Sequence, residues 1–408
     1  MHTLPKISHR GVHAPPSPVR KLVPHADKAK EKGKKVYHLN IGDPDFLLPD
    51  EIKKELEMLV KNLTQIPYSN ARGEKKLITA WEEYYKQVGV SLTYDDIIVT
   101  TGGSEALILA AAAIFHPEDK FLVFEPFYAN YSGFANLVSA KVVPVSLSED
   151  NGFHLPSDEE IEKKIDMDTK AIFFTNPNNP TGTVFTKEEV RRVLDIANKH
   201  NLFIVADETY RGICFEGKKS VSVLELANEH EAQRIILTDS VSKRLNVCGA
   251  RIGVLISKNK EVMDAVFRFA QARLSVGYLE QLMIAPMLSH CLPYVAELAE
   301  KYESRRNVFL DTIEKKLDIK IHRPEGAFYT MVPLPVDDTE EFAKWLLTDF
   351  SDNNETVMVA PGPGFYATAG KGKNEIRVAY VLNEKDLQRA AELIALGVEQ
   401  YNKIKKKS

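Results

Sequence analysis

A lysine preceded by two serines stands out at the end of an apolar segment of the sequence. The segment 234–238 reads RIILT, and Ser240, Ser242 and Lys243 follow it, with Arg251 eight residues after the lysine. A lysine held at the edge of a sheet beside other cations is expected to have a lowered pKa. Such an amine is a nucleophile that can form a Schiff base with a carbonyl compound. The stretch therefore predicts a lysine with a chemical role.

Three other apolar segments also run into residues that could bind a ligand. They lead into Gly102-Gly103-Ser104, into the NPNNPTG loop that holds Asn179, and into Asp207 with Tyr210 three residues later. A helix beginning at the glycines would offer free backbone N–H groups to an anion. The two Asn-Pro pairs would hold Asn179 in a rigid loop, and a buried Asp207 needs a positively charged partner. Taken singly, each feature also fits an ordinary turn or a buried ion pair.

The segments that position these residues are short, apolar and rich in β-branched side chains. They occupy 95–101, 120–125, 140–147, 170–176, 202–208, 234–240 and 251–257. Helical patterns alternate with them, as after Thr186, where a capping box with Glu189 precedes apolar residues at helical spacing. This order predicts an α/β fold, with a largely parallel sheet covered by helices on both faces. Ligands bind beyond the carboxyl ends of such strands, where the polar residues stand.

The pattern changes after about residue 290, where a long charged helix is followed by strand-like pieces and a closing helix. We expect a second, smaller α+β domain there. The predicted division is an N-terminal arm and part of the small domain in 1–45, a large domain in 46–289, and the small domain in 290–408.

Composition excludes several classes of protein. The 408 residues are 44% hydrophobic and 27% charged, with a net charge of −4, which argues against a protein that binds nucleic acid or a membrane surface. Cys214, Cys248 and Cys291 are too few and too scattered for a disulfide framework or a zinc site, and the histidines have no metal-binding spacing. The spacing of these cysteines and histidines therefore predicts no metal site. No signal peptide or apolar run of membrane-spanning length is present, so we expect a cytoplasmic location.

A Schiff base between Lys243 and pyridoxal phosphate (PLP) would give each strand end a task. Four residues could bind the phosphate: Gly103, Ser104, Ser240 and Arg251. Asp207 could pair with the pyridinium nitrogen and so make the ring an electron sink. Asn179 and Tyr210 could bind the phenolic oxygen of the ring. PLP is therefore the cofactor predicted by the residues.

The same motifs resemble those of a known family. NPNNPTG, ADETY, SVSK and GARIG are similar to the motifs of PLP-dependent aminotransferases of fold type I, class I/II, the aspartate aminotransferase superfamily. The resemblance extends from LNIGDPDF at 39–46 to NEIRVAYV at 374–381. It implies a three-layer large domain with a mostly parallel seven-stranded sheet and a smaller α+β domain. It also implies ping-pong transfer of an amino group from an L-amino acid to a 2-oxo acid.

The resemblance assigns further roles residue by residue. Lys243 matches the lysine that forms the aldimine and moves the substrate proton, and Asp207 matches the partner of the pyridine nitrogen. Tyr128 matches the aromatic ring that stacks on the cofactor. Tyr68 matches a tyrosine that reaches the phosphate in the neighbouring subunit, which implies a homodimer with shared active sites. Around the substrate's α-carboxylate, the matching residues are Gly42, Asn179 and Arg377.

The amino donor is less certain from these motifs. Aspartate with 2-oxoglutarate is the first expectation, and aromatic or other neutral amino acids are the second. Some prokaryotic aspartate enzymes have a lysine where this chain has Ser104. Arg273 is a candidate for binding a distal carboxylate instead, although an interface salt bridge is the favoured explanation for it, and Arg72 is a weaker candidate.

Two alternative functions compete with amino-group transfer, and the role of one further segment remains open. A lyase, decarboxylase or synthase could use the same Lys243, whereas a non-enzymatic domain of a transcriptional regulator would need a basic DNA-binding segment, which the sequence lacks. The Gly-rich segment 361–374 is expected to be a mobile loop over the site. In it, Phe365 and Tyr366 either shape the substrate pocket or pack.

Overall fold

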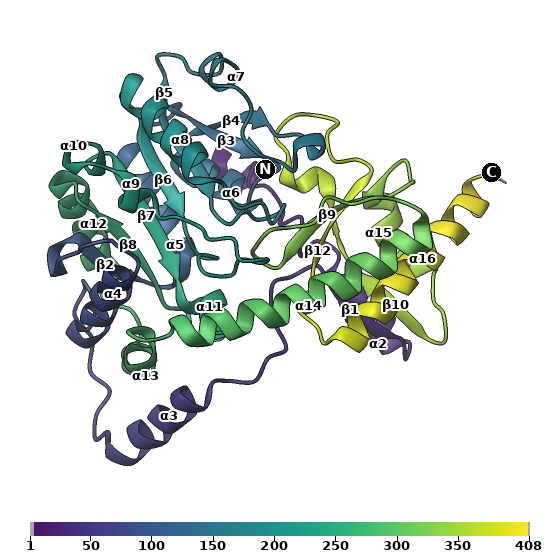
Figure 1. Cartoon of the computed structure of the whole chain (residues 1–408), viewed down its shortest axis with the longest axis horizontal. Helices are drawn as coiled ribbons and strands as arrows, with labels where there is room; N and C mark the ends of the chain where they lie inside the picture. The colour runs from purple at the N-terminus through teal and green to yellow at the C-terminus, as the bar shows by residue number, and fades with distance from the viewer. Residues whose placement is uncertain (1–3, 407–408) are drawn as a thin grey trace.

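A seven-stranded sheet forms the centre of the larger part of the molecule (Figure 1). The structure, a computed structural model, describes residues 4–406. The strands are β2 (Ile97–Thr100), β3 (Lys120–Glu125), β4 (Lys141–Ser146), β5 (Thr169–Thr175), β6 (Phe203–Asp207), β7 (Ile235–Ser240) and β8 (Gly253–Ser257). Their order is β2-β8-β7-β6-β5-β3-β4, and within this sheet only β8 runs antiparallel to its neighbours. The seven expected strands and the mostly parallel sheet are confirmed.

Helices cover both faces of this sheet. One face packs against α5 (Gly102–Ile114), α6 (Asn130–Val138) and α12 (Lys260–Ala272), and the other against α4 (Lys75–Gln87), α8 (Lys187–Lys199) and α9 (Val223–Leu226). Successive side chains of a strand point to opposite faces. In β6, Val205 accordingly packs into the core on the α5 side, whereas Ile204 and Ala206 pack into the core on the α8 side. Strands buried on both faces explain the continuous apolar runs in the sequence.

Two small sheets form the second part of the molecule. An antiparallel sheet contains β11 (Ala360–Pro361), β12 (Glu375–Ala379) and β9 (Tyr329–Pro333), and β1 (Lys35–His38) pairs in parallel with β10 (Glu355–Met358). The helices here are α2 (Val23–Glu31), α15 (Thr339–Thr348) and α16 (Glu384–Lys405), and α14 (Leu292–Leu317) runs toward them from beside the large sheet (Figure 1). The smaller α+β part is thus confirmed, and the boundaries at 45/46 and 289/290 stay a prediction.

The remaining helices are short or lie at the periphery. They are α1 (His9–Val12), α3 (Asp50–Asn62), α7 (Asp158–Glu162), α10 (Glu229–Ala232), α11 (Val241–Arg244) and α13 (Tyr278–Leu288). Within residues 4–406 no single helix is long and apolar enough to cross a membrane. The pair α13 and α14 meets that test only when taken together, and the two helices are bent by 89°.

The expected capping box begins α8. The Thr186 side chain accepts a hydrogen bond from the Glu189 backbone N–H at 3.1 Å, and the Glu189 carboxylate accepts one from the Thr186 N–H at 2.8 Å. The apolar residues Val190, Val193 and Leu194 that follow are fully buried. The helix thereby covers β5 and β6, whose ends carry the Asn-Pro loop and Asp207.

Replacing Thr186 with alanine should destabilise the protein by about 1 kcal/mol, because an N-cap acceptor is lost while the buried face of α8 is unchanged. The midpoint of urea unfolding, followed by circular dichroism, measures the effect. Thr186→Ser is the matched control, because it keeps the hydroxyl group. Equal destabilisation by both changes would mean that the threonine acts through packing rather than capping.

Candidate active site

A cleft of about 580 Å³ lies beyond the ends of β6 and β7, where the large sheet faces β9 and β12. Eleven of the twelve residues predicted for the site line it: Gly42, Gly103, Ser104, Tyr128, Asn179, Asp207, Tyr210, Ser240, Lys243, Arg251 and Arg377. Tyr68 does not line the cleft, and 84% of its surface is exposed. Residues more than 330 positions apart in the sequence, Gly42 and Arg377, thus meet in one space.

Asp207 is the last residue of β6 and is buried without a positively charged partner. Burial raises the pKa of its carboxyl group to about 6, although hydrogen bonds from Thr209, including its backbone N–H at 3.1 Å, act in the opposite direction. No cation in residues 4–406 forms an ion pair with Asp207. The expected cationic partner is therefore not supplied by the described chain, and a positively charged ligand atom would be stabilised here.

Lys243 lies on α11 and points into the cleft. Its Nζ donates hydrogen bonds to the Gly42 carbonyl at 2.6 Å and to Cys248 Sγ at 3.3 Å. Burial lowers the pKa of this amine, but the combined effect of Tyr329 and Cys248 raises the pKa by more than burial lowers it, so the net shift is upward. The expectation of a lowered pKa is wrong for the chain by itself. The groups near the Lys243 amine are hydroxyl and thiol groups that stabilise its ammonium form, and no cation is among the main influences on its pKa.

An anion-binding end of the cleft forms where α5 begins. Gly102 has φ +73°, and a side chain at this position would place Cβ 2.5 Å from Arg251 Nη2. A Cβ on Gly253 would similarly approach the carbonyl carbon of Gly102 to 2.5 Å. The Ser240 hydroxyl donates to the backbone or to Ser242 Oγ, 2.8 Å away. The glycines thus allow Arg251 and Ser240 to lie beside the free N–H groups of a helix N-terminus, which suits a phosphate.

Arg377 provides a second anion site at the opposite side, on β12. Its Nη1 donates to Asn179 Oδ1 at 3.1 Å and its Nη2 donates to the Asn40 carbonyl at 2.6 Å. The guanidinium lies 4.4 Å from the centre of the Tyr329 ring, and its buried Nε has no hydrogen-bond partner. No carboxylate of the described residues pairs with it. Burial lowers its pKa, and a planar carboxylate ligand would restore the favourable charged state.

Tyrosines complete the walls of the cleft. Tyr210 and Tyr329 are joined through their hydroxyl groups at 3.1 Å, and the Tyr128 hydroxyl accepts a hydrogen bond from Asn130 Nδ2 at 2.8 Å. Burial raises the pKa of both Tyr128 and Tyr210, so these hydroxyl groups remain protonated donors. Tyr329, Asn130, Thr209 and Cys248 were not foreseen from the sequence. The first of these stands in the strand-like GAFYTM segment, whose sequence has no site motif.

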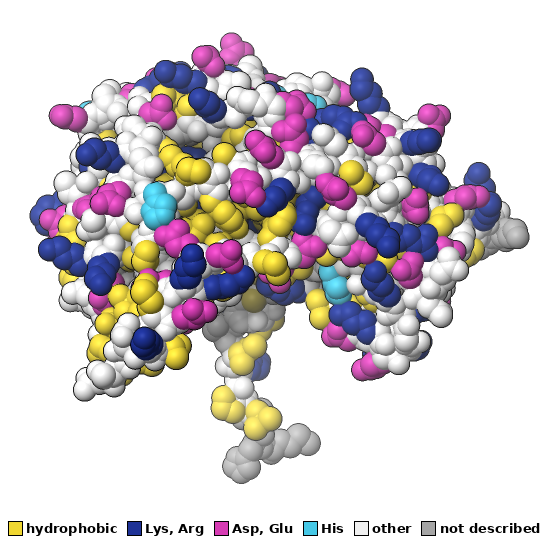
Figure 2. Space-filling view, turned by 60° about the horizontal axis from the view of Figure 1, so that its bottom comes forward, with side chains coloured by type: hydrophobic (Ala, Val, Ile, Leu, Met, Phe, Trp, Pro, Cys, Tyr) yellow, Lys and Arg dark blue, Asp and Glu magenta, His cyan; other side chains and the backbone are white. Residues whose placement is uncertain are grey.

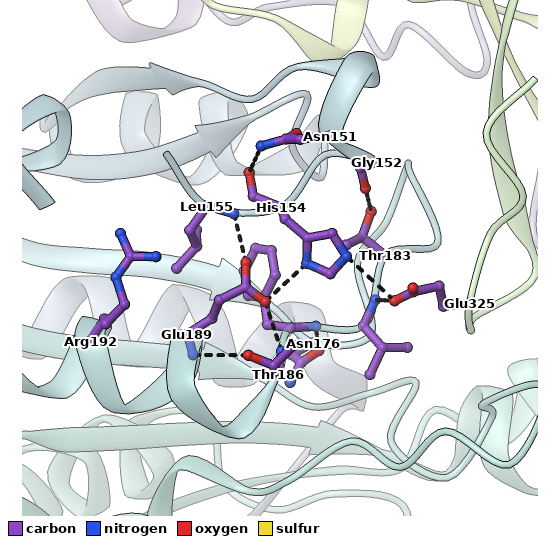
Figure 3. Close-up of polar contacts among 12 residues, drawn as sticks. Asn151, Gly152, His154, Leu155, Asn176, Thr183, Thr186, Glu189, Arg192 and Glu325 are labelled. Carbon is purple, nitrogen blue, oxygen red and sulfur yellow. Dashed lines mark hydrogen bonds and ion pairs between the residues drawn. The ribbon is translucent and has the colours of Figure 1, made fainter. Parts of the chain in front are cut away.

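A charged cluster holds the Asn-Pro loop that carries Asn179. Figure 3 shows the His154 imidazole between Glu189 and Glu325, at 2.9 Å from Glu189 Oε2 and 3.8 Å from Glu325 Oε2. Glu325 also accepts a hydrogen bond from the Val184 backbone N–H at 3.2 Å. The backbone N–H of Glu325 donates to the Gly182 carbonyl at 2.9 Å. Glu325, which precedes β9, thus binds the end of the Asn-Pro loop at both Gly182 and Val184.

The other residues considered for substrate contact have different positions. Arg273 donates to the carbonyls of Ala71 and Val99 and forms an ion pair with Glu105 at 3.3 Å. Arg72 donates to two backbone carbonyls and lies against two aromatic rings. Neither arginine lines the cleft, so the distal-carboxylate role is not supported within this chain.

Packing also accounts for the aromatic residues of segment 361–374. Phe365 is fully buried, with its ring 4.8 Å from the Arg377 guanidinium, and the Tyr366 hydroxyl donates to Glu375 at 2.6 Å. Glu125 accepts hydrogen bonds from the backbone N–H groups of residues 367 and 368 at 2.9 and 3.0 Å. The segment is therefore fastened to the large sheet, and neither aromatic side chain lines the cleft. No cluster suited to a metal ion occurs among the described residues.

Comparison with known proteins identifies the family. The model of aminotransferase class I and II matches residues 34–394. The chain belongs to this family. An aspartate aminotransferase of Pyrococcus horikoshii is 28% identical over 94% of this chain and 95% of its own. An LL-diaminopimelate aminotransferase of Dehalococcoides mccartyi is 30% identical over 96% and 98%. A solved alanine aminotransferase from Pyrococcus furiosus has a TM-score of 0.87 at 28% identity, covering 97% of this chain and all of its own.

Class I and II aminotransferases depend on PLP, and the cleft of this aminotransferase suits the cofactor. A buried carboxylate lacks a cation at Asp207, and a buried guanidinium lacks an anion at Arg377. Between them, Lys243 offers an amine, and the start of α5 offers a phosphate site. Each unpaired group has a counterpart in PLP or in an amino acid. The relatives compared are all named as aminotransferases, which favours amino-group transfer over the lyase or synthase alternative and the regulator alternative.

The His154 cluster makes the stability of the aminotransferase depend on pH. Hydrogen bonds to Glu189 and Glu325 raise the pKa of His154 from 6.5 to about 9, despite partial burial. Because the folded-state pKa is the higher one, the cluster stabilises fully below pH 6.5 and loses its effect as pH rises through 9. His154→Gln should lower stability by on the order of 2 kcal/mol at pH 6, with little difference remaining above pH 9.

Calorimetric melting temperatures of both proteins between pH 6 and pH 10 measure this difference. His290→Gln, a change at an exposed histidine outside the cluster, is the control for loss of an imidazole. A His154→Gln difference that is constant across this pH range would contradict a charged His154.

Proposed function

We propose that this aminotransferase moves the amino group of L-aspartate to 2-oxoglutarate by a ping-pong mechanism in the cytoplasm. The charge of the cleft carries the proposal for the substrates. Six charged side chains line it, and the four cations Arg20, Lys243, Arg251 and Arg377 outnumber the two carboxylates Asp43 and Asp207. A cationic cleft favours dianionic substrates. The free state of all three cysteines is consistent with the proposed location.

The residues divide between cofactor and substrate. PLP, when bound, supplies an electron sink that stabilises negative charge at the substrate's Cα. Asp207 would keep the ring nitrogen protonated, since a buried, unpaired carboxylate gains most from a cationic partner. The α5 N-terminus, Ser240 and Arg251 would hold the phosphate, and Tyr128 would lie against the ring. Asn179 and Tyr210 would donate to its phenolic oxygen.

Three residues would act at the substrate itself. Arg377 would bind the α-carboxylate with its planar guanidinium group, which its hydrogen bond to Asn179 holds in place. Gly42 would lie beside this carboxylate, and the position requires glycine because a Cβ there would approach the Tyr329 hydroxyl to 1.9 Å. Lys243, which lies on α11 and lines the cleft, would move the proton from the substrate's Cα as a general base.

A neutral donor is the second candidate, because the solved relative with a TM-score of 0.87 carries the name alanine aminotransferase. The two functions differ in whether the cleft must neutralise a second carboxylate. A panel of amino donors with 2-oxoglutarate, and of 2-oxo acids with aspartate, separates them. Aspartate and glutamate should have the highest kcat/KM, whereas a preference for alanine or an aromatic amino acid would overturn the proposed substrates.

Lys243→Ala should abolish transfer in this panel, reducing kcat by at least about 10³-fold, because the residue supplies both the cofactor anchor and the general base. The visible absorbance band of the PLP-loaded protein should change as well. The control is Lys21→Ala, at a surface lysine paired with Glu340. Turnover of the Lys243→Ala protein at the wild-type rate, with PLP still bound, would show that another residue is the base.

We also propose that the protein is a homodimer whose subunits share their active sites. Figure 2 shows exposed hydrophobic side chains on the face that the view brings forward. Large exposed apolar residues include Leu47, Val60, Ile66 and Leu274. Exposed apolar side chains that gather on one face favour a protein interface. Tyr68 lies in the same exposed 47–68 region and could reach a partner's phosphate site.

Light scattering coupled to gel filtration should give twice the chain mass. Tyr68→Phe should weaken PLP binding several-fold, because one hydrogen bond to a charged phosphate is lost. Tyr94→Phe, at another partly exposed tyrosine, is the control, and PLP affinity is measured by equilibrium titration. A monomer of full activity, or an unchanged PLP affinity in Tyr68→Phe, would overturn the shared site.

A further inference from the structure

Two charged side chains of the cleft have no task in the chemistry described above. Of the six that line it, Lys243, Asp207, Arg251 and Arg377 act on the cofactor or on the substrate's α-carboxylate. Arg20 and Asp43 remain. A carboxylate repels a second acidic group of a substrate, so Arg20 is the cleft cation left to attract one.

Arg20 stands on a turn that the structure holds in place. The Val19 carbonyl accepts a hydrogen bond from Asn40 Nδ2 at 2.7 Å, and the Asn40 carbonyl accepts one from Arg377 Nη2 at 2.6 Å. Asn40 is itself buried. On the other side, Pro18 packs so closely on Gly364 that a Cβ there would approach it to 2.1 Å. Two hydrogen bonds through one buried residue therefore link the turn of Arg20 to the arginine for the α-carboxylate.

The Arg20 guanidinium is also uncommitted within residues 4–406. It forms neither an ion pair nor a hydrogen bond there, whereas the adjacent Lys21 forms an ion pair with Glu340 on α15. The two other arginines considered for this role, Arg72 and Arg273, are occupied by backbone carbonyls and Glu105. Arg20 is exposed to solvent and lines the cleft. An arginine whose five donors are free can bind a planar carboxylate through two of them.

We propose that Arg20 binds the distal carboxylate of a dicarboxylic substrate and so determines the preference for acidic amino acids and 2-oxo acids. This inference rests on the proposed function and identifies the residue that selects dicarboxylic substrates for the proposed reaction. Arg377 holds the α-carboxylate, and Arg20 holds the second carboxylate. The turn that carries Arg20 is bound by Asn40, whose carbonyl also binds Arg377. The N-terminal segment thereby becomes part of the substrate site, a role that its sequence did not indicate.

The test compares dicarboxylic with monocarboxylic substrates in the PLP-loaded enzyme. In Arg20→Gln, the ratio of kcat/KM for aspartate to that for alanine should fall roughly 10- to 100-fold, mainly through the KM for aspartate, because a charged hydrogen-bonded pair is lost. Lys21→Gln removes a cation from the same turn but not from the cleft, and it should keep the wild-type ratio.

A binding measurement separates recognition from turnover. Succinate should bind wild-type enzyme more tightly than butyrate, and Arg20→Gln should lose this difference in a calorimetric titration. If wild-type enzyme prefers aspartate and Arg20→Gln retains both the preference and the succinate affinity, the inference about Arg20 is wrong. If wild-type enzyme itself does not prefer dicarboxylic substrates, the proposed function fails instead. Equal losses for aspartate and alanine would show that Arg20 supports the fold of the turn rather than substrate choice.

Discussion

The buried ion pair between Asp239 and Arg244 is the interaction on which the geometry of the cleft depends. Both side chains are fully buried, and Arg244 Nη2 lies 2.8 Å from Asp239 Oδ2. Tyr85 donates to the same carboxylate at 2.8 Å, and the Arg244 guanidinium lies 4.3 Å from the centre of the Tyr84 ring. Removing either charge would leave the other buried and uncompensated, at a cost of about 3–5 kcal/mol. The pair therefore fixes the turn between β7 and α11.

Each partner of this pair is the sequence neighbour of a cleft residue. Asp239 precedes Ser240, and Arg244 follows Lys243, so the turn that buries the pair presents the serine and the lysine to the opposite side. The end of β6 is built in the same way, because Glu208 follows Asp207 and forms an ion pair with Arg211 at 3.0 Å.

Both turns rest on one helix. The Arg211 guanidinium lies 4.9 Å from the Tyr84 ring and 4.6 Å from the Tyr85 ring of α4. Burial raises the pKa of Glu208 to about 7, while Arg211 and hydrogen bonds from Ser222 and Val223 lower it. The cleft residues at the ends of β6 and β7 are thus held from behind by charged side chains that do not line the cleft.

Sequence patterns located the strands and most of the site, because both depend on local order. A parallel sheet brings the ends of its strands to one edge, so Asn179, Asp207 and Lys243 could be placed together from apolar segments and the polar residues that end them. The upward pKa shift of Lys243 could not be foreseen, since it depends on Tyr329, which arrives from a different sheet. Arg20 was missed for the same reason: its turn is held at the cleft by contacts with the distant residues Asn40 and Gly364, and no motif marks it.

Three buried carboxylates at the ends of β6 and β7 show where the ligand belongs. Asp239 and Glu208 have arginine partners behind the strands, whereas Asp207, on the cleft side, has none in the described chain. Fold stability would favour pairing or replacing such a carboxylate, because burial opposes its charge and raises its pKa to about 6. Its persistence is explained if the cation comes with the cofactor. Binding of PLP would then satisfy Asp207 and stabilise the fold that places it, in proportion to its occupancy.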